Sequence, residues 1–133
     1  MRPAALIDEL VASIRVLVVD DEPLFVEMVE AMLGTEEGIE IAGRAADGAE
    51  GVRLAGELDP DVVLMDISMP VMNGIDATRQ IRVRNPDACV LILTGGSNVA
   101  DIDKARMAGA AGYLTKDRIA SDLVSEIREL AER

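Results

Sequence analysis

Short runs of β-branched and aliphatic residues alternate along this chain with longer stretches whose apolar residues recur at helical spacing. The alternation occurs five times, which is typical of strand–helix units repeated around a parallel sheet. The predicted strands cover residues 15–19, 39–43, 62–65, 89–93 and 112–115. The predicted helices cover about residues 23–33, 47–58, 74–84, 98–108 and 119–131. This order of elements predicts a single α/β domain over residues 15–133.

The strands differ in how apolar they are. The runs at 15–19, 62–65 and 89–93 are apolar nearly throughout, as expected for strands with helices on both faces of the sheet. The run "IEIAG" at 39–43 alternates apolar and other residues, which predicts a strand at the edge of the sheet.

Residues 1–14 precede the first predicted strand and contain "PAALIDELVASI". Pro3 stands near the start, and five apolar residues fall on one helical stripe, namely Leu6, Ile7, Leu10, Val11 and Ile14. We therefore expect an N-terminal amphipathic helical extension. Three possibilities stay open for it: covering the domain's own apolar surface, self-association, or disorder.

Composition excludes several classes of function. A net charge of −12 repels phosphate backbones, and aromatic residues make up only 2% of the chain, so bases have little to stack on. The apolar runs are too short to span a bilayer and no leader segment opens the chain, which predicts a soluble cytoplasmic protein without a membrane partner. The single cysteine, Cys89, cannot form an internal disulfide and is interpreted as a buried, inert thiol.

Polar residues stand where the predicted strands end. The strand ends carry Asp20 and Asp21, then Asp66, then Thr94, and finally Thr115 and Lys116. Taken singly, each has a structural explanation as a helix cap, a turn residue or a surface lysine. Because the carboxyl ends of parallel strands meet at one edge of a sheet, we expect these side chains to converge there.

The ordered set "VVDDE", "DISMPVMNG", "LTGG" and "GYLTKD" resembles the receiver domain of two-component response regulators over about residues 15–131. The resemblance implies a three-layer, flavodoxin-like (CheY-like) (βα)5 fold with sheet order 2-1-3-4-5. It implies that Asp66 is the phosphoacceptor, that Thr94 and Tyr113 are the switch residues, and that Lys116 belongs to the site. It also implies that the domain promotes only its own phosphorylation and dephosphorylation and is otherwise not an enzyme.

The residue types favour a hard cation. Three carboxylates packed together repel one another unless a cation compensates, and oxygen ligands without His or Cys suit Mg²⁺, with Mn²⁺ as a substitute. We assign Asp21 and Asp66 as direct ligands and Asp20 as a ligand through water. The family pattern implies that the backbone carbonyl of Ser68 supplies a further contact.

The segments "GYLTKD" and "DISMPVMNGIDATRQIR" are similar to the NarL/LuxR subfamily of transcriptional regulators. Asp117 follows Lys116 where many receivers have a proline in a cis bond, which puts that peptide geometry in doubt here. The resemblance implies a sensor histidine kinase as phosphodonor, a homodimer on activation, and DNA contact only through a C-terminal helix-turn-helix domain of a full protein. The chain ends at "IRELAER", so both an excised receiver, which we favour, and a stand-alone receiver stay open.

Other classes fit the residues less well. Phosphatases that use a strand-end aspartate carry a second acid two residues later, where this chain has Ser68. A flavodoxin-like electron carrier needs a phosphate-binding loop after the first strand, and that loop here is "DDEP". Pro70 is interpreted as stiffening the loop after Asp66, and Gly74 as permitting the sharp turn into the next helix. Phe25 is interpreted as a core residue or as part of a kinase-docking surface.

Overall fold

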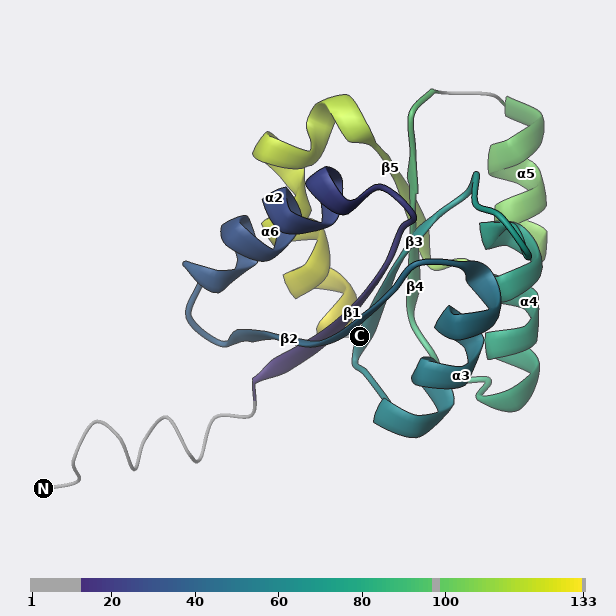
Figure 1. Cartoon of the computed structure of the whole chain (residues 1–133), viewed down its shortest axis with the longest axis horizontal. Helices are drawn as coiled ribbons and strands as arrows, with labels where there is room; N and C mark the ends of the chain where they lie inside the picture. Colours follow the sequence, from purple (N-terminus) through teal and green to yellow (C-terminus); the bar gives the residue numbers. More distant parts are fainter. Residues whose placement is uncertain (1–12, 97–98, 133) are drawn as a thin grey trace, which may run out of the picture.

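The computed structural model describes residues 13–96 and 99–132, and its elements are labelled as in Figure 1. The strands are β1 (Ile14–Val19), β2 (Ile39–Ala45), β3 (Val62–Asp66), β4 (Val90–Thr94) and β5 (Gly112–Thr115). The helices are α2 (Pro23–Gly34), α3 (Gly48–Leu58), α4 (Gly74–Arg84), α5 (Val99–Met107) and α6 (Ile119–Ala131). A short 3-10 turn, η1 (Lys116–Arg118), joins β5 to α6.

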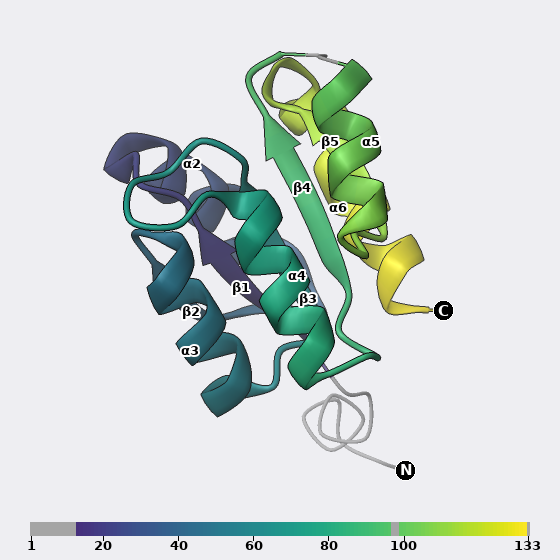
Figure 2. The ribbon, with the colours of Figure 1, turned by 90° about the vertical axis from the view of Figure 1, so that its right-hand side faces the viewer.

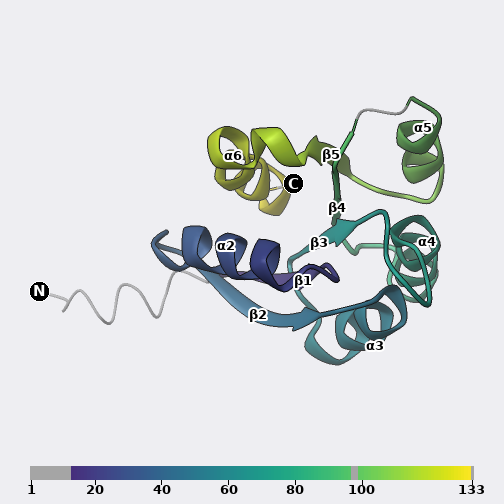
Figure 3. The ribbon, with the colours of Figure 1, turned by 45° about the horizontal axis from the view of Figure 1, so that its top comes forward.

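The strands form one parallel sheet in the order β2-β1-β3-β4-β5, which confirms the predicted topology. In Figure 3 the sheet lies between two helical layers, with α2 and α6 on one face and α3, α4 and α5 on the other. Figure 2 looks onto the layer of three helices. As predicted from its alternating sequence, β2 lies at an edge, while the apolar strands β1, β3 and β4 lie inside the sheet.

Two apolar clusters fill the spaces between the layers, because alternate residues of each inner strand face opposite sides of the sheet. In β1, Val16 and Val18 pack with α2 and α6, whereas Leu17 and Val19 pack with the three-helix layer. All four side chains are fully or almost fully buried. The sheet that carries the strand ends is therefore held rigidly on both faces.

Two details of the elements differ from the sequence-based expectations, and a third agrees with them. Ile14 opens β1 and so does not belong to the expected N-terminal helix, whose residues 1–12 lie outside the described part of the chain. Cys89 precedes β4 and is only partly buried, since pairing with β3 starts at Val90; the carbonyl of Cys89 still accepts a hydrogen bond from Val63 N–H at 2.8 Å. The doubt about a cis bond after Lys116 was justified, because the described residues contain no cis peptide.

The helices begin at recognisable signals. The side chain of Asp47 caps α3 by accepting from Glu50 N–H, and that of Asn73 caps α4 by accepting from Asp76 N–H. At α2 the capping position is held by Glu22, which makes no side-chain cap, and Pro23 stands in the first turn. The alternative that Asp20 or Asp21 serves as the N-cap of this helix is therefore wrong, and both acids remain available to a site.

Within residues 13–96 and 99–132, no helix has the length and apolar character needed to cross a bilayer.

Candidate functional site

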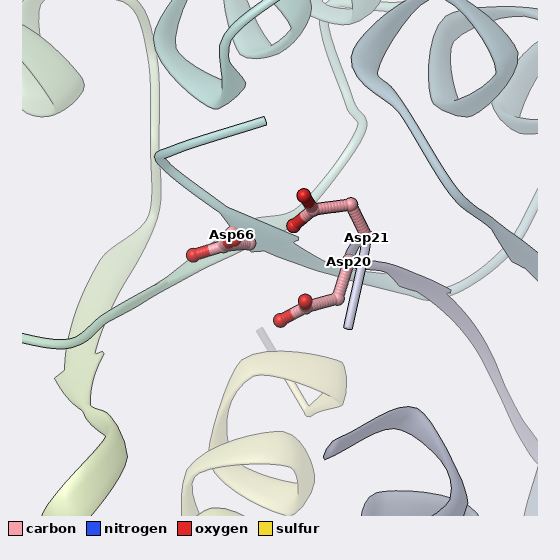
Figure 4. Close-up of side chains that lie close together, drawn as sticks. All are labelled: Asp20, Asp21 and Asp66. Atoms are coloured by element: carbon pink, nitrogen blue, oxygen red, sulfur yellow. The ribbon is translucent and has the colours of Figure 1, made fainter. Parts of the chain in front are cut away.

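Three carboxylates meet at the C-terminal edge of the sheet. Asp20 and Asp21 follow β1, and Asp66 is the last residue of the neighbouring strand β3. Figure 4 shows the three side chains extending from these strand ends into the same region. Each offers a carboxylate oxygen, and these oxygens lie within 4.8 Å of one another. Asp20 and Asp66 are buried, with 3% and 5% of their surface exposed, while Asp21 is exposed.

The surroundings of Asp66 disfavour its charged form. Burial raises the pKa of Asp66 to about 6, and the negative charges of Asp20 and Asp21 act in the same direction. The positive charge of Lys116 acts to lower the pKa but does not outweigh these effects. The three carboxylates thus carry more negative charge than the ammonium of Lys116 compensates. This excess of negative charge favours the binding of a further cation.

Lys116 supplies the positive charge that lies among these acids. Its ammonium donates a hydrogen bond to Asp20 Oδ2 at 2.9 Å and lies 3.6 Å from Asp66 Oδ1 and 3.7 Å from Glu22 Oε1. Burial acts to lower the pKa of Lys116, but the hydrogen bond to Asp20 and the nearby carboxylates outweigh burial and raise the pKa. Lys116 is therefore charged at neutral pH and sits where the sequence placed it, at the end of the last strand.

Two contacts of Lys116 were not predicted from the sequence. Glu22 follows the acid pair directly, and Phe25 lies in the first turns of α2 with its ring centroid 4.2 Å from Lys116 Nζ. Phe25 is half-buried and packs against the core cluster beneath α2, so its interpretation as a core residue covers only part of its surroundings. The sequence offered one partial signal, namely that Phe25 falls in the first turn of a helix that starts beside the acid pair.

Thr94 and Tyr113 lie on the other flank of Asp66, on β4 and β5. The Thr94 hydroxyl donates to the carbonyl of Gly96 at 2.7 Å and accepts from Gly96 N–H at 3.3 Å, so it is engaged with its own loop. Tyr113 is 42% exposed and lines a surface hollow together with residues of α6. The predicted roles of these two residues as switches stay predictions.

The loop between β3 and α4 packs tightly beneath the site. A Cβ atom added at Gly74 would overlap the carbonyl oxygen of Asp66, and one added at Gly48 would overlap that of Met72. Gly74 is therefore needed for this close approach and not, as expected from the sequence, for freedom in a sharp turn, because its φ is not positive. Val71 does have a positive φ, of 67°, and Met72 N–H donates across it to the carbonyl of Pro70 at 2.7 Å. Ser68 is exposed in the same loop.

Comparison with known proteins agrees with this fold. The family model described as "Response regulator receiver domain" matches residues 16–128, and the chain belongs to this family of two-component signalling domains. Aspartate phosphorylation is characteristic of the family.

Among curated relatives, the transcriptional regulatory protein LiaR of Bacillus subtilis strain 168 is 42% identical over 115 residues, which are 86% of this chain and 54% of LiaR. The response regulator GacA of Pseudomonas aeruginosa is 40% identical over 117 residues, 88% of this chain and 55% of GacA. The chain thus spans about half the length of the curated relatives it matches.

Solved structures give the same result. A LuxR-family two-component response regulator from Aurantimonas sp. SI85-9A1 superposes with a TM-score of 0.86 at 38% identity, covering 92% of this chain and 88% of that one. The receiver domain of the putative response regulator NarL from Mycobacterium tuberculosis superposes with a TM-score of 0.87 at 33% identity, covering 91% and 98%. The predicted resemblance to the NarL/LuxR subfamily is confirmed.

Proposed function

We propose that this receiver domain stores a phosphoryl group on the carboxylate of Asp66 and passes the change on through its surface. The observation that carries the proposal is the convergence of Asp20, Asp21 and Asp66 with the ammonium of Lys116 at one edge of a rigid sheet. Asp66 combines burial with a strand end, so it is fixed in position and still lies beside the exposed Asp21.

The carboxylates fit a divalent metal. They supply oxygen ligands without His or Cys, which suits Mg²⁺ or, in its place, Mn²⁺. We assign Asp21 and Asp66 as direct ligands, with the carbonyl of Ser68 as a further one. Asp20 is better suited to contact through water, because its Oδ2 accepts from Lys116 and its Oδ1 accepts from Glu22 N–H at 2.9 Å. When bound, the cation neutralises negative charge around the phosphoryl group.

The reaction is an in-line transfer. A carboxylate oxygen of Asp66 forms a bond to phosphorus while the bond from phosphorus to the donor breaks, and the donor keeps that electron pair. With a phosphohistidine donor the leaving group is the imidazole, which then takes a proton; with acetyl phosphate it is acetate. Lys116, 3.6 Å from Asp66 Oδ1, donates to the transferring group and offsets its charge. The product is an acyl phosphate.

We propose that Thr94 and Tyr113 respond to the acyl phosphate. The new group carries roughly −1.5 to −2 charges and several acceptor oxygens. The hydroxyl of Thr94 would leave the carbonyl of Gly96 and donate to a phosphoryl oxygen, and the exposed ring of Tyr113 would turn into the space that Thr94 vacates. The face formed by α5, β5 and α6 would then change shape.

The partners follow from the family. We propose a sensor histidine kinase as phosphodonor and a homodimer as the activated state. In the full protein a C-terminal DNA-binding domain would provide the output; relatives such as LiaR, named as transcriptional regulatory proteins, are about twice as long as the matched segment. The receiver itself would not contact nucleic acid, since its net charge is −12. It would catalyse only its own phosphorylation and dephosphorylation.

The proposal is tested by incubating the chain with Mg²⁺ and acetyl phosphate and following its intact mass. We expect a gain of one phosphoryl group per chain. Asp66→Asn should take up none, because an amide oxygen is a poor nucleophile and a weaker metal ligand, and a chelator should abolish uptake by the unaltered protein.

Asp87→Asn is the matched control, because Asp87 is an exposed acid in the turn after α4 and lies outside the carboxylate cluster. Its uptake should equal that of the unaltered chain. Undiminished phosphorylation of Asp66→Asn would show that another residue accepts the group, and failure of the unaltered chain to gain mass would refute the proposed function.

A further inference from the structure

The ammonium of Lys116 has an aromatic neighbour as well as carboxylate neighbours. The centroid of the Phe25 ring lies 4.2 Å from Nζ, within the range of a cation–π contact, and only 19% of the Lys116 side chain is exposed. Phe25 is the only phenylalanine in the chain, and aromatic residues are 2% of its composition. The contact between the Phe25 ring and the Lys116 ammonium is therefore a specific feature of the molecule.

Neighbouring structure holds the Phe25 ring in place. α2 starts at the C-terminal edge of the sheet, next to the acid pair, with Pro23 fixing the backbone of its first turn. The ring is half-buried and packs against the apolar cluster between α2, α6 and the sheet. Because the ring is fixed by the core while its surface reaches Lys116, it can restrain a long, flexible side chain.

The neighbours of Lys116 affect its ammonium in different ways. Asp20 takes one of the three ammonium hydrogens, at 2.9 Å, and Glu22 offers a competing acceptor at 3.7 Å on a side chain that is 68% exposed. The ring attracts the positive charge without taking up a hydrogen. Without the ring, the ammonium would have more freedom to move toward Glu22 and away from Asp66.

We propose that Phe25 is a positioning residue: its ring holds the Lys116 ammonium beside Asp66 and keeps it from moving to Glu22. The proposal rests on the proposed function of Asp66 as phosphoacceptor. Transfer is fastest when the group that meets the developing charge already stands in place and needs no rearrangement. Phe25 thus acts on the reaction through Lys116 and does not itself touch the phosphoryl group.

The first test measures the rate of phosphoryl uptake from acetyl phosphate with Mg²⁺. Phe25→Leu keeps an apolar side chain but removes the ring, and should slow uptake about 2- to 30-fold. Phe25→Tyr keeps the ring and should restore the rate. Leu24→Ala, at a residue 81% exposed on the same helix, should leave it unchanged. Urea unfolding of each variant confirms that only folded protein is compared.

A second comparison separates positioning from packing. Glu22→Gln removes the competing charge and no helix cap, because the Glu22 side chain makes none. If Phe25 prevents movement toward Glu22, Glu22→Gln should raise the rate of Phe25→Leu by a larger factor than it changes the rate of the unaltered chain. Equal slowing in Phe25→Leu and Phe25→Tyr, or no recovery in the double variant, would overturn the proposal.

A third measurement does not depend on phosphorylation. The chain has two lysines, Lys104 and Lys116, so ¹³C labelling at lysine Cε gives two NMR signals, with the exposed Lys104 as internal reference. The Lys116 signal should show restricted motion in the unaltered chain and in Phe25→Tyr, and motion approaching that of Lys104 in Phe25→Leu. Unchanged restriction in Phe25→Leu would overturn the positioning role even if Asp66 is phosphorylated. If no variant takes up phosphate, the proposed function fails while this comparison still decides whether the ring holds Lys116.

Discussion

At the scale of single residues, Asp66 is the residue whose environment most opposes its ordinary chemistry. A carboxylate at the end of a fully buried strand, beside two other acids, stays protonated to a higher pH than usual, and its pKa is about 6. The same surroundings prepare it for a cation, because a bound cation would relieve the repulsion that raises the pKa. Metal binding should therefore release a proton below about pH 6.

The raised pKa of Asp66 predicts a pH-dependent stability. Between its ordinary pKa of 3.8 and about 6, the folded state holds a proton that the unfolded state has lost. The contribution of Asp66 to stability is therefore fully present below pH 3.8 and is lost as the pH rises through about 6. A shift of this size corresponds to about 3 kcal/mol.

In chelator at pH 7.5, we therefore expect the free energy of unfolding of Asp66→Asn to exceed that of the unaltered chain by up to about 3 kcal/mol. The difference should shrink toward pH 4. Urea unfolding of both proteins across this range checks it, with Asp87→Asn as the control for loss of one surface acid. A difference that does not change with pH would contradict the assigned origin.

At the scale of the elements, α4 is placed by its contact with the backbone of Asp66. Its first residue, Gly74, touches the carbonyl of that strand end, and Gly74 N–H donates to the carbonyl of Ile67 at 2.8 Å. The Thr78 hydroxyl donates to the carbonyl of Gly74 at 2.7 Å from a fully buried position. The start of this helix and Asp66 therefore form one packed unit.

Gly74→Ala should disturb this unit. The added methyl group has no room against Asp66, so we expect a loss of about 1–3 kcal/mol in the free energy of unfolding and slower phosphoryl uptake. Gly56→Ala is the matched control, because a Cβ there, inside α3, meets no atom within 4 Å and should stabilise the helix by about 0.5–1 kcal/mol. Equal effects of the two substitutions, measured by urea unfolding and intact mass, would argue against the close-approach explanation.

The elements also show how far the sequence could predict the structure. The strand ends were predictable because each apolar run stops at a polar residue, and parallel topology brings such ends together. The reason why a glycine is needed at position 74 was not predictable, because it depends on how closely a helix approaches a strand. The contact between the Phe25 ring and Lys116 was not predictable either, since the two residues lie far apart in the chain and meet only in the folded molecule. Cys89 was predicted to lie in a strand because the apolar run begins one residue before Val90, the first residue paired with β3.

At the scale of the whole molecule, the charge is unbalanced. The chain has 25 acidic and 13 basic residues, and self-repulsion of the excess opposes the compact state. Any salt screens that repulsion, whereas a site for a divalent cation adds a second, specific gain in stability.

We therefore expect Mg²⁺ to raise the thermal unfolding midpoint more than sodium chloride at matched ionic strength, by an amount that saturates with concentration. At a free Mg²⁺ concentration a hundredfold above the Kd of the site, binding adds about 2.7 kcal/mol to the free energy of unfolding. Asp21→Asn should lose most of the Mg²⁺-specific part and keep the response to sodium chloride. Thermal scans decide this, and identical responses to the two salts in the unaltered chain would mean that the acids hold no specific cation.

The middle position of β3 in the sheet divides the edge around Asp66 into two sides. Under the proposed function, the acids on the β1 side take part in the uptake of the phosphoryl group, and Thr94 and Tyr113 on the β4 and β5 side take part in the surface change that follows. Substitutions on one side could therefore change which surface responds without changing how the phosphoryl group is taken up, and substitutions on the other side could do the opposite. Lys116 is the exception, because it follows β5 and its ammonium donates to Asp20 at the end of β1. A substitution of Lys116 would therefore alter both the uptake of the phosphoryl group and the response of the surface.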